Sequence, residues 1–222
     1  MKAYFISGLG ADRKAFYKLK LPPGYEPVYL DWISPQNNES LKEYAKRFSG
    51  SINDKEKFIL IGLSFGGMIA SEIARIKTPL KLILLSSVAA SDEMPWYFRV
   101  AGKFRMQRII PVVLYKRATL LNHFMGTKNK DDKAMVMSFV RQTDPEFIRW
   151  SINAILGWEQ HEPLKDIIHI HGNKDRLLPI KYTNANHRID NGRHLMVLNK
   201  ANEINKILQE VLPVTGNQSS NN

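Results

Sequence analysis

A serine stands where an apolar run changes into a helical pattern. The run FILIGLSFGGMIASEIA begins at Phe58, and residues 62–66 within it read G-L-S-F-G, a G-x-S-x-G motif centred on Ser64. On a sharp turn between a strand and a helix, a serine presents its hydroxyl group beyond the end of the strand, and glycines two residues away on each side relieve crowding. The same motif is also compatible with a serine that only caps the helix. The placement of the motif favours Ser64 as a nucleophile.

A serine nucleophile needs a base, and the chain has six histidines. His123 and His161 fall within helical patterns, and His187 begins the last strand pattern. His194 follows the turn-forming residues 190–193 and precedes the last helical pattern. A loop in that position can bring an imidazole over the edge of a sheet. We therefore predict that His194 is the base.

Two further histidines share a predicted strand. His169 and His171 are two residues apart, so they lie on one face of that strand and resemble a metal-binding pair. No third ligand is evident in the sequence, and we expect both to be buried or edge histidines. The chain has no cysteine, which excludes thiolate catalysis, disulfides and Cys-ligated metals. No metal site is predicted.

The base in turn needs an acid that orients it. Asp175 lies in HGNKDRLLP, just past the carboxyl end of an apolar strand pattern, and active-site loops of open α/β sheets lie at that end. A turn residue that binds its own backbone is the alternative for Asp175. Asp92, which follows the preceding strand pattern, is the second candidate for the acid.

The elements that carry these residues alternate between strands and helices. Near-continuous apolar strands that alternate with helices indicate a mostly parallel sheet, flanked by helices, of the α/β class. The predicted strands lie within residues 2–8, 26–32, 57–62, 80–87, 166–175 and 186–194, and the predicted core helices within 11–21, 40–52, 67–76 and 198–212.

The alternation stops at Ser91. Residues 91–163 show four helical patterns, within 95–111, 113–126, 130–143 and 145–160, and no good strand pattern. We predict an α/β core formed by residues 1–90 and 164–212, a helical cap formed by residues 91–163 and inserted late in the sheet, and a disordered tail at residues 213–222.

Charge and hydropathy narrow the choice of partners. The net charge is +11, and residues 1–90, 91–166 and 167–222 carry excesses of +5, +3 and +3, so the basic residues are spread along the chain. A nucleic-acid module concentrates its charge on one face, and we predict no nucleic-acid partner. No apolar run is long enough to span a membrane, and the first residues do not resemble a signal peptide. We expect a cytoplasmic protein without stable membrane insertion.

The order Ser64, Asp175, His194 is the order of a known family. Over residues 1–212 the chain resembles the α/β-hydrolase family, in particular its small serine esterase-like members, and the elbow GLSFGG and the acid segment HGNKDRLLP are the most specific parts of the resemblance. The family usually has His-Gly after its third strand, where this chain has Ser7-Gly8. The chain also starts at what would be that third strand, so about six strands are expected.

The resemblance implies a serine hydrolase that cleaves a carboxylic ester or a related small acyl compound through an acyl-enzyme. Ser64 would be the nucleophile, His194 the base and Asp175 the acid, with the backbone N–H groups of Leu9 and Phe65 as the oxyanion hole. Neither a metal nor an organic cofactor is required. The alternatives are a ligand-binding scaffold without turnover, or a C–C hydrolase or perhydrolase with the same three residues.

Aromatic residues of the cap are candidates for the substrate pocket. We name Trp96, Phe124 and Trp150 as substrate-binding candidates, although most such side chains hold cap helices to a sheet. The cap also carries four basic residues, Arg99, Lys103, Arg105 and Arg108. They belong either to a solvated helix face or to a site for an anionic leaving group. The sequence predicts neither the acyl length, nor the leaving group, nor the oligomeric state.

Overall fold

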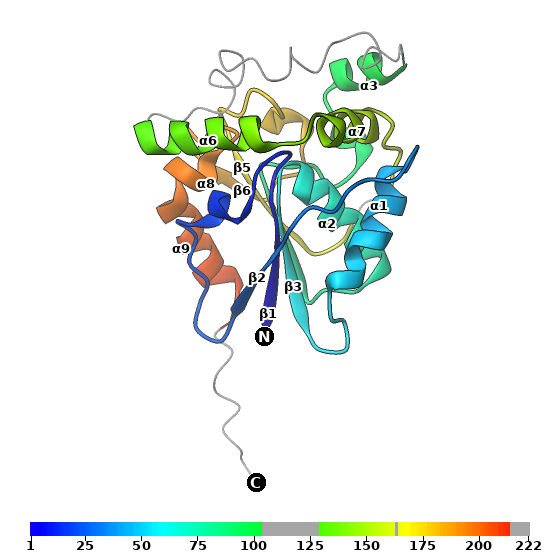
Figure 1. The fold of residues 1–222 in the computed structure, drawn as a ribbon. Coiled ribbons are helices and arrows are strands. Elements are labelled where there is room, and N and C mark those ends of the chain that lie inside the picture. The colour runs from blue at the N-terminus through cyan, green and yellow to red at the C-terminus, as the bar shows by residue number, and fades with distance from the viewer. Residues whose placement is uncertain (104–128, 163, 214–222) are drawn as a thin grey trace.

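A computed structural model describes residues 1–103, 129–162 and 164–213 of the chain (Figure 1). One parallel sheet of six strands runs through its centre, in the order β2-β1-β3-β4-β5-β6. The strands are β1 (Lys2–Ile6), β2 (Glu26–Leu30), β3 (Phe58–Leu63), β4 (Lys81–Leu85), β5 (Ile167–Gly172) and β6 (His187–Ile189). The predicted α/β class and strand number are confirmed.

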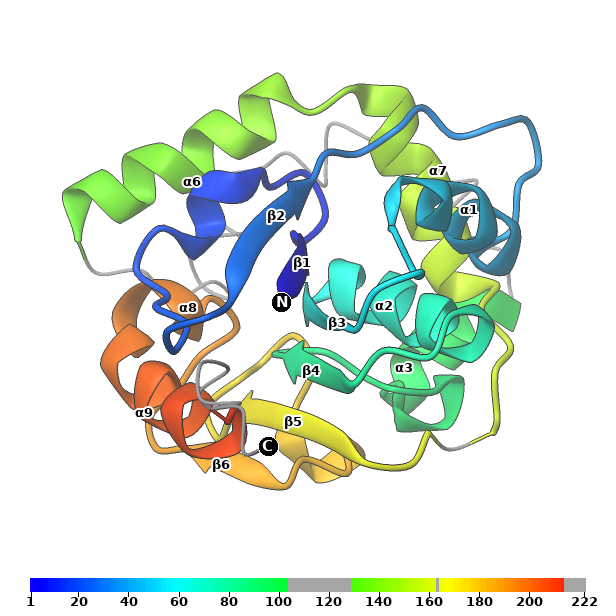
Figure 2. The ribbon, with the colours of Figure 1, turned by 90° about the horizontal axis from the view of Figure 1, so that it is seen from below.

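Helices cover both faces of the sheet. On one face lie α1 (Leu41–Phe48) and α2 (Phe65–Ile76), and on the other lie the 3-10 turn η1 (Arg13–Phe16), α8 (Met196–Asn199) and α9 (Ala201–Val211), as Figure 2 shows from below. The helices α3 (Trp96–Lys103), α6 (Lys130–Gln142) and α7 (Pro145–Leu156) lie beyond the carboxyl ends of the strands (Figure 1). Short 3-10 turns complete the described elements: η2 (Ser49–Ser51), η3 (Ser91–Glu93) and η5 (Ile180–Tyr182).

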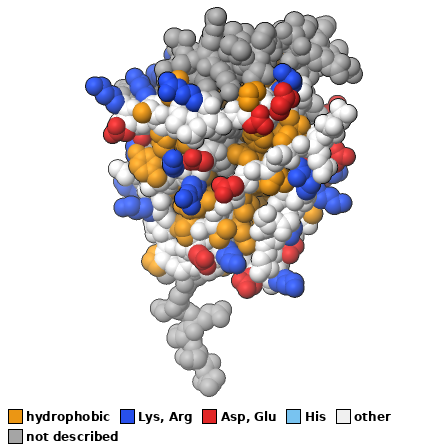
Figure 3. Space-filling model, viewed as in Figure 1, with side chains coloured by type: hydrophobic (Ala, Val, Ile, Leu, Met, Phe, Trp, Pro, Cys, Tyr) orange, Lys and Arg blue, Asp and Glu red, His pale blue; other side chains and the backbone are white. Residues whose placement is uncertain are grey.

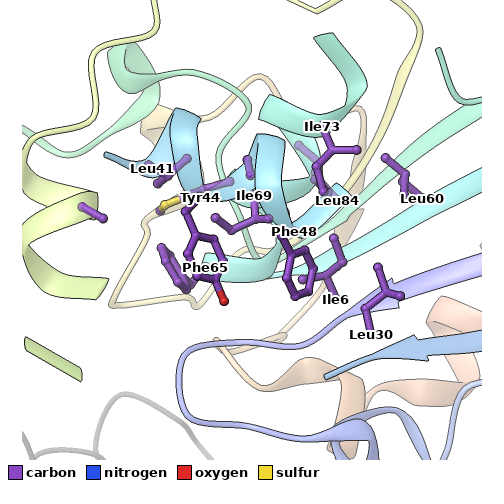
Figure 4. Close-up of a cluster of buried hydrophobic side chains, with 14 of the residues drawn as sticks. Ile6, Leu30, Leu41, Tyr44, Phe48, Leu60, Phe65, Ile69, Ile73 and Leu84 are labelled. Carbon is purple, nitrogen blue, oxygen red and sulfur yellow. The ribbon is translucent and has the colours of Figure 1, made fainter. Parts of the chain in front are cut away.

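The alternation of side chains along each strand builds two separate cores. In β1, Tyr4 and Ile6 point toward α1 and α2, whereas Ala3 and Phe5 point toward η1 and α8. All six residues of β3 are buried, which is the pattern of a central strand covered on both faces. Figure 4 shows the cluster on the α1 and α2 side. Burial on both faces holds the carboxyl ends of the central strands in place.

The helix predicted from the spacing of its apolar residues is confirmed. The four residues of that stripe, Leu41, Tyr44, Ala45 and Phe48, are buried in α1. Ser40 begins this helix through a capping box with Glu43, in which each side chain binds the backbone N–H of the other residue.

Two core helices differ from their predicted extents. The helical pattern of residues 11–21 forms only the single 3-10 turn η1, because the chain turns away after Tyr17 toward the edge strand β2. The last helix is split into α8 and α9, since Lys200 has the non-helical φ of −130°. The first difference arises because the chain must reach the edge strand β2, which a local pattern does not report.

The described part of the predicted cap is helical. Between β4 and β5, the described residues form α3, α6, α7 and the turn η3, and they contain no strand. The helix predicted at 113–126 lies outside the described residues, as do the later part of 95–111 and nearly all of the tail predicted at 213–222.

One face of the molecule carries side chains of both charges (Figure 3). Basic and acidic side chains are interleaved over the face seen in Figure 3. Among the described residues, no helix combines the length and the apolar character that crossing a membrane requires.

Candidate active site

Ser64 occupies a strained turn between β3 and α2. Strand β3 ends at Leu63 and helix α2 begins at Phe65, so Ser64 alone makes the junction. Its φ and ψ are 52° and −120°, a conformation that a residue with a side chain rarely adopts. Ser64 holds the N-cap position of α2, yet its side chain makes no capping hydrogen bond. The hydroxyl group is therefore free for another partner.

The glycines around Ser64 allow this turn by their lack of a Cβ atom. A Cβ atom on Gly62 would lie 2.5 Å from the Cα atom of Gly67. On Gly66 it would collide with the backbone carbonyl groups of Ile6 and Ser7 at the end of β1. The turn thus packs backbone against backbone, as the G-x-S-x-G spacing predicts.

A chain of two hydrogen bonds links Ser64 to Asp175 through His194. Ser64 Oγ lies 2.8 Å from His194 Nε2, and His194 Nδ1 lies 2.8 Å from Asp175 Oδ2. Because the carboxylate accepts, Nδ1 carries the ring proton, and Nε2 accepts from the Ser64 hydroxyl. The side chains of His194 and Asp175 are almost completely buried. The structure therefore brings together the three residues that the sequence singles out.

Asp175 uses its two oxygens for two purposes. Oδ1 accepts the backbone N–H groups of Leu177 and Leu178, each at 2.9 Å, so Asp175 does form the turn considered from the sequence. Oδ2 faces His194. Burial alone would raise the pKa of Asp175, but the neighbouring His194 and His171 outweigh burial and lower this pKa well below its usual value. The carboxyl group is therefore ionised at neutral pH.

Close backbone packing places His194 beside the acid loop, residues 173–179, which follows β5 and carries Asp175. Strand β6 pairs with β5, and a tight turn follows it, in which Asn191 has a φ of 56°. A Cβ atom on Gly192 would lie 2.9 Å from the Cα atom of Gly172, the last residue of β5. The two loops can approach this closely only because both positions are glycine, and the approach brings His194 next to Asp175.

The second candidate for the acid is incorrect. Asp92 Oδ1 lies 2.8 Å from Nδ1 of His161, and both side chains are exposed. This surface pair is separate from the cavity that holds Ser64. The contacts of Asp92 therefore exclude it as the partner of His194.

The loop after β1 lies directly against Ser64. A Cβ atom on Gly8 would lie 3.6 Å from Cβ of Ser64, so the next residue, Leu9, borders the same space. Gly10 has a φ of 73° and turns the chain back, and its carbonyl accepts from Thr143 Oγ1 at the end of α6. Phe65 begins α2, where the first backbone N–H groups have no acceptor within the helix. Leu9 and Phe65 thus both line the cavity that contains Ser64.

A cavity of about 430 Å³ opens above Ser64 and His194. Almost all of its lining side chains are apolar, and they come from the β1 loop, the acid loop and the cap helices. The cap contributes Tyr97, Phe98 and Ala101 from α3, Val136 and Phe139 from α6, and Ile148, Ile152, Ile155 and Leu156 from α7. The described helices of the insertion therefore roof the serine.

The aromatic residues named for the pocket lie elsewhere or outside the described residues. Trp150 packs on Tyr44 with ring centroids 4.3 Å apart, and its Nε1 donates to the backbone carbonyl of Glu39, so it holds α7 to the core. Trp96 is 58% exposed and does not line the cavity. Phe124 lies outside the described residues. Tyr97 and Phe98 line the cavity instead, because helical geometry points neighbouring residues in different directions.

The basic residues of the cap are described only in part. Arg99 is exposed and does not line the cavity, which agrees with a solvated helix face. Arg105 and Arg108 lie outside the described residues, and the side chain of Lys103 is not described.

His169 and His171 are buried and bind protein groups. His171 Nε2 lies 2.7 Å from the carbonyl oxygen of Leu178, and His169 Nε2 lies 3.0 Å from that of Ser87. The two rings meet, with His171 Nδ1 3.2 Å from His169 Nε2. Among the described residues, no group of three or more side chains is arranged to hold a metal ion. The sequence predicted buried or edge histidines at these positions but not their place behind Asp175.

Ser87 is a site residue that the sequence analysis missed. Its hydroxyl donates to the backbone carbonyl of Ser64 over 2.7 Å. A Cβ atom on Gly67 would collide with this hydroxyl, so the glycine makes room for it. The only signal in the sequence is the position of Ser87 just after β4, at the same sheet edge as Ser64.

The comparisons with known proteins find similarity in structure alone. No family model and no curated protein sequence matches the chain. A lipase-esterase related protein from Clostridium acetobutylicum ATCC 824 superposes with a TM-score of 0.67 at 17% identity, over 94% of this chain and 93% of that chain. An esterase from Exiguobacterium antarcticum gives 0.64 at 15% identity, over 95% and 91%. The enol-lactonase from Burkholderia xenovorans LB400 gives 0.62 at 13% identity, over 94% and 90%. With its six-stranded parallel sheet and the turn that carries Ser64, this chain has the α/β-hydrolase fold.

Proposed function

We propose that this protein is a serine hydrolase that cleaves carboxylic esters, or closely related acyl compounds, with an apolar acyl group. The observation that carries the proposal is the pair of 2.8 Å hydrogen bonds from Ser64 Oγ to His194 Nε2 and from His194 Nδ1 to Asp175 Oδ2. A serine, a histidine and a buried carboxylate in this geometry form the catalytic triad of acyl-transfer enzymes.

Each residue has one role in the first half of the reaction. Ser64 Oγ attacks the ester carbonyl carbon while His194 Nε2 takes the hydroxyl proton. Asp175 keeps the proton of His194 on Nδ1 and stabilises the imidazolium that forms. His194 then gives the proton to the leaving alcohol, and the acyl group stays on Ser64. Water, activated by the same histidine, releases the acid in the second half.

The negative charge that develops on the carbonyl oxygen needs hydrogen-bond donors. The backbone N–H groups of Leu9 and Phe65 are our candidates, since Leu9 borders the cavity and Phe65 starts α2. The position of Phe65 at the amino end of a 12-residue helix adds the favourable end of the helix dipole. Backbone donors need no particular side chain, so the Ser7-Gly8 sequence is compatible with this role.

The shape and lining of the cavity support an apolar acyl group. About 430 Å³ of mostly aliphatic and aromatic lining favours burial of hydrocarbon and disfavours a charged acyl chain. Few polar side chains are among the described residues that line the cavity: Ser64, Tyr97, Thr143 and His194. Structurally similar proteins include an esterase and an enol-lactonase, and both names describe cleavage of ester bonds.

A fluorophosphonate probe followed by mass mapping of the labelled peptide tests the proposal. We expect one label on Ser64 of the wild-type protein and none on Ser64→Ala, with Ser51→Ala, an exposed serine, as a matched control that labels normally. Hydrolysis of p-nitrophenyl esters should fall by about 10⁴-fold or more in Ser64→Ala. A folded wild-type protein that neither labels nor hydrolyses these esters would instead be a binding scaffold.

A further inference from the structure

Two buried histidines lie behind the carboxylate of Asp175 and have no part in the mechanism proposed above. His169 and His171 are on β5, the strand that leads into the acid loop, and both are almost completely buried. His171 Nε2 lies 3.4 Å from Asp175 Oδ2, the oxygen that also faces His194. The imidazole rings of His171 and His194 therefore both approach Oδ2 of Asp175.

The partners of the two rings define where their protons are. Carbonyl oxygens only accept hydrogen bonds, so the Nε2 atoms of His171 and His169 both carry a proton for Leu178 and Ser87. In a neutral ring the other nitrogen then accepts, which allows His171 Nδ1 to receive the Nε2–H of His169 at 3.2 Å. Burial, with a smaller effect of His171, lowers the pKa of His169 to about 3, so this ring is neutral at physiological pH. The Leu178 carbonyl thus selects the tautomer of His171, and His169 supports it.

These contacts form a closed series that connects all the residues of the site. The Ser87 hydroxyl donates to the Ser64 carbonyl, and the Ser87 carbonyl accepts from His169. His169 meets His171, which lies against Asp175, and Asp175 returns to Ser64 Oγ through His194. The ends of β3, β4 and β5 are joined by this circuit at the edge of the sheet where the site lies.

His171 also holds the acid loop itself. It donates to the carbonyl of Leu178, whose own N–H donates to Asp175 Oδ1 over 2.9 Å. Leu178 also lines the cavity. One ring thus restrains the backbone of the loop, and the same nitrogen lies 3.4 Å from the second oxygen of its carboxylate.

We propose that His171, held in one tautomer by the Leu178 carbonyl and by His169, is a positioning residue that aims the carboxylate of Asp175 at His194. The proposal rests on the function proposed above for the triad. Loss of the ring should let the carboxylate move out of line with His194.

Three substitutions at one position test this role. Asparagine and glutamine carry the same amide, but only glutamine extends far enough to place its N–H group near the position of Nε2. We expect His171→Phe and His171→Asn to lower kcat about 10-fold, with KM within about twofold. His171→Gln should restore kcat, and His187→Gln, on the edge strand β6, should behave as wild type.

A purely structural role would give a different pattern. If all three variants lose activity equally, or if none of them changes kcat, His171 does not position Asp175. The proton on His194 Nδ1 provides a readout without turnover, because its NMR signal reports the hydrogen bond to Asp175. We expect this signal to shift in the Phe and Asn variants and to return in the Gln variant. That response in a protein that the fluorophosphonate probe does not label would refute the proposed hydrolase and leave the role of His171 intact.

Discussion

Nδ1 of His194 lies 2.8 Å from Oδ2 of Asp175, although the two residues are 19 positions apart and belong to different loops. The side chains of both are nearly inaccessible to water. An ion pair that forms here on protonation of His194 is shielded from solvent, so it is stronger than a pair on the surface. This relationship makes Asp175 the residue on which activity should depend most strongly after Ser64 and His194.

The first prediction compares two aspartates. Asp175→Asn should lower kcat by about 10⁴-fold, because an amide can donate to His194 Nδ1 and so favours the wrong tautomer. Asp92→Asn changes only an exposed pair with His161 and should remain within about twofold of wild type. Steady-state kinetics with a p-nitrophenyl ester measures both. A larger loss of kcat in Asp92→Asn would show that Asp92, in the turn η3, is the catalytic acid.

The second prediction concerns the elbow. Gly66→Ala places a Cβ atom against the backbone carbonyl groups of Ile6 and Ser7, which cannot move without shifting β1. We expect the free energy of unfolding to fall by about 2–3 kcal/mol, as for other overpacked sites. Gly50→Ala is the matched control, since a Cβ atom there meets nothing within 4 Å. Urea unfolding at neutral pH compares the two, and equal stability of both variants would contradict the crowded elbow.

The third prediction is a loss of stability in mild acid that arises from His169. Its pKa is about 3 in the folded protein, against an ordinary value of 6.5. Between these values the unfolded chain binds a proton that the folded chain does not, so this contribution to stability is complete above about pH 6.5 and is lost as the pH falls. From about pH 7.5 to about pH 5 the loss should be about 2 kcal/mol.

The variant His169→Gln isolates this contribution. Glutamine does not titrate, so the free energy of unfolding of the variant should fall by about 2 kcal/mol less than that of the wild type over the same range. The lowered pKa of Asp175 does not contribute there, because stability from a depressed carboxyl pKa is lost only below the unfolded value of about 4. Urea unfolding at the two pH values is the measurement. Equal losses in both proteins would show that His169 is protonated in the folded state.

The fourth prediction uses the cavity to change acyl-chain preference. Ile152 lines the cavity from α7, and Ile152→Trp should fill part of its 430 Å³. We expect kcat/KM for an octanoate ester to fall at least about 10-fold, while that for an acetate ester stays within about threefold. Asn153→Trp, at an exposed position of the same helix, should change neither value. If both esters respond equally to Ile152→Trp, the acyl chain does not enter this cavity.

Local features of the sequence were sufficient to predict the six strands, the turn at Ser64 and the helical insertion. Strand and helix periodicity arises from the geometry of the backbone itself, and the need for glycine at positions 62 and 66 arises from crowding within one turn. The helix α1 and its capping residue Ser40 could likewise be read from spacing alone. The chain order of Ser64, Asp175 and His194 is also a property of the sequence.

Only the tertiary structure decided which acid meets the histidine and which side chains line the cavity. Asp175 reaches His194 because β5 pairs with β6 and because Gly172 and Gly192 allow their loops to touch, and neither fact has a local signature. Trp150 was expected near the substrate, but the packing of α7 against α1 turned it toward Tyr44. The ring of contacts through Ser87, His169 and His171 joins three strands that are distant in sequence. Such contacts depend on how elements pack, and packing involves the whole chain at once, whereas periodicity and turn chemistry involve only a few neighbouring residues.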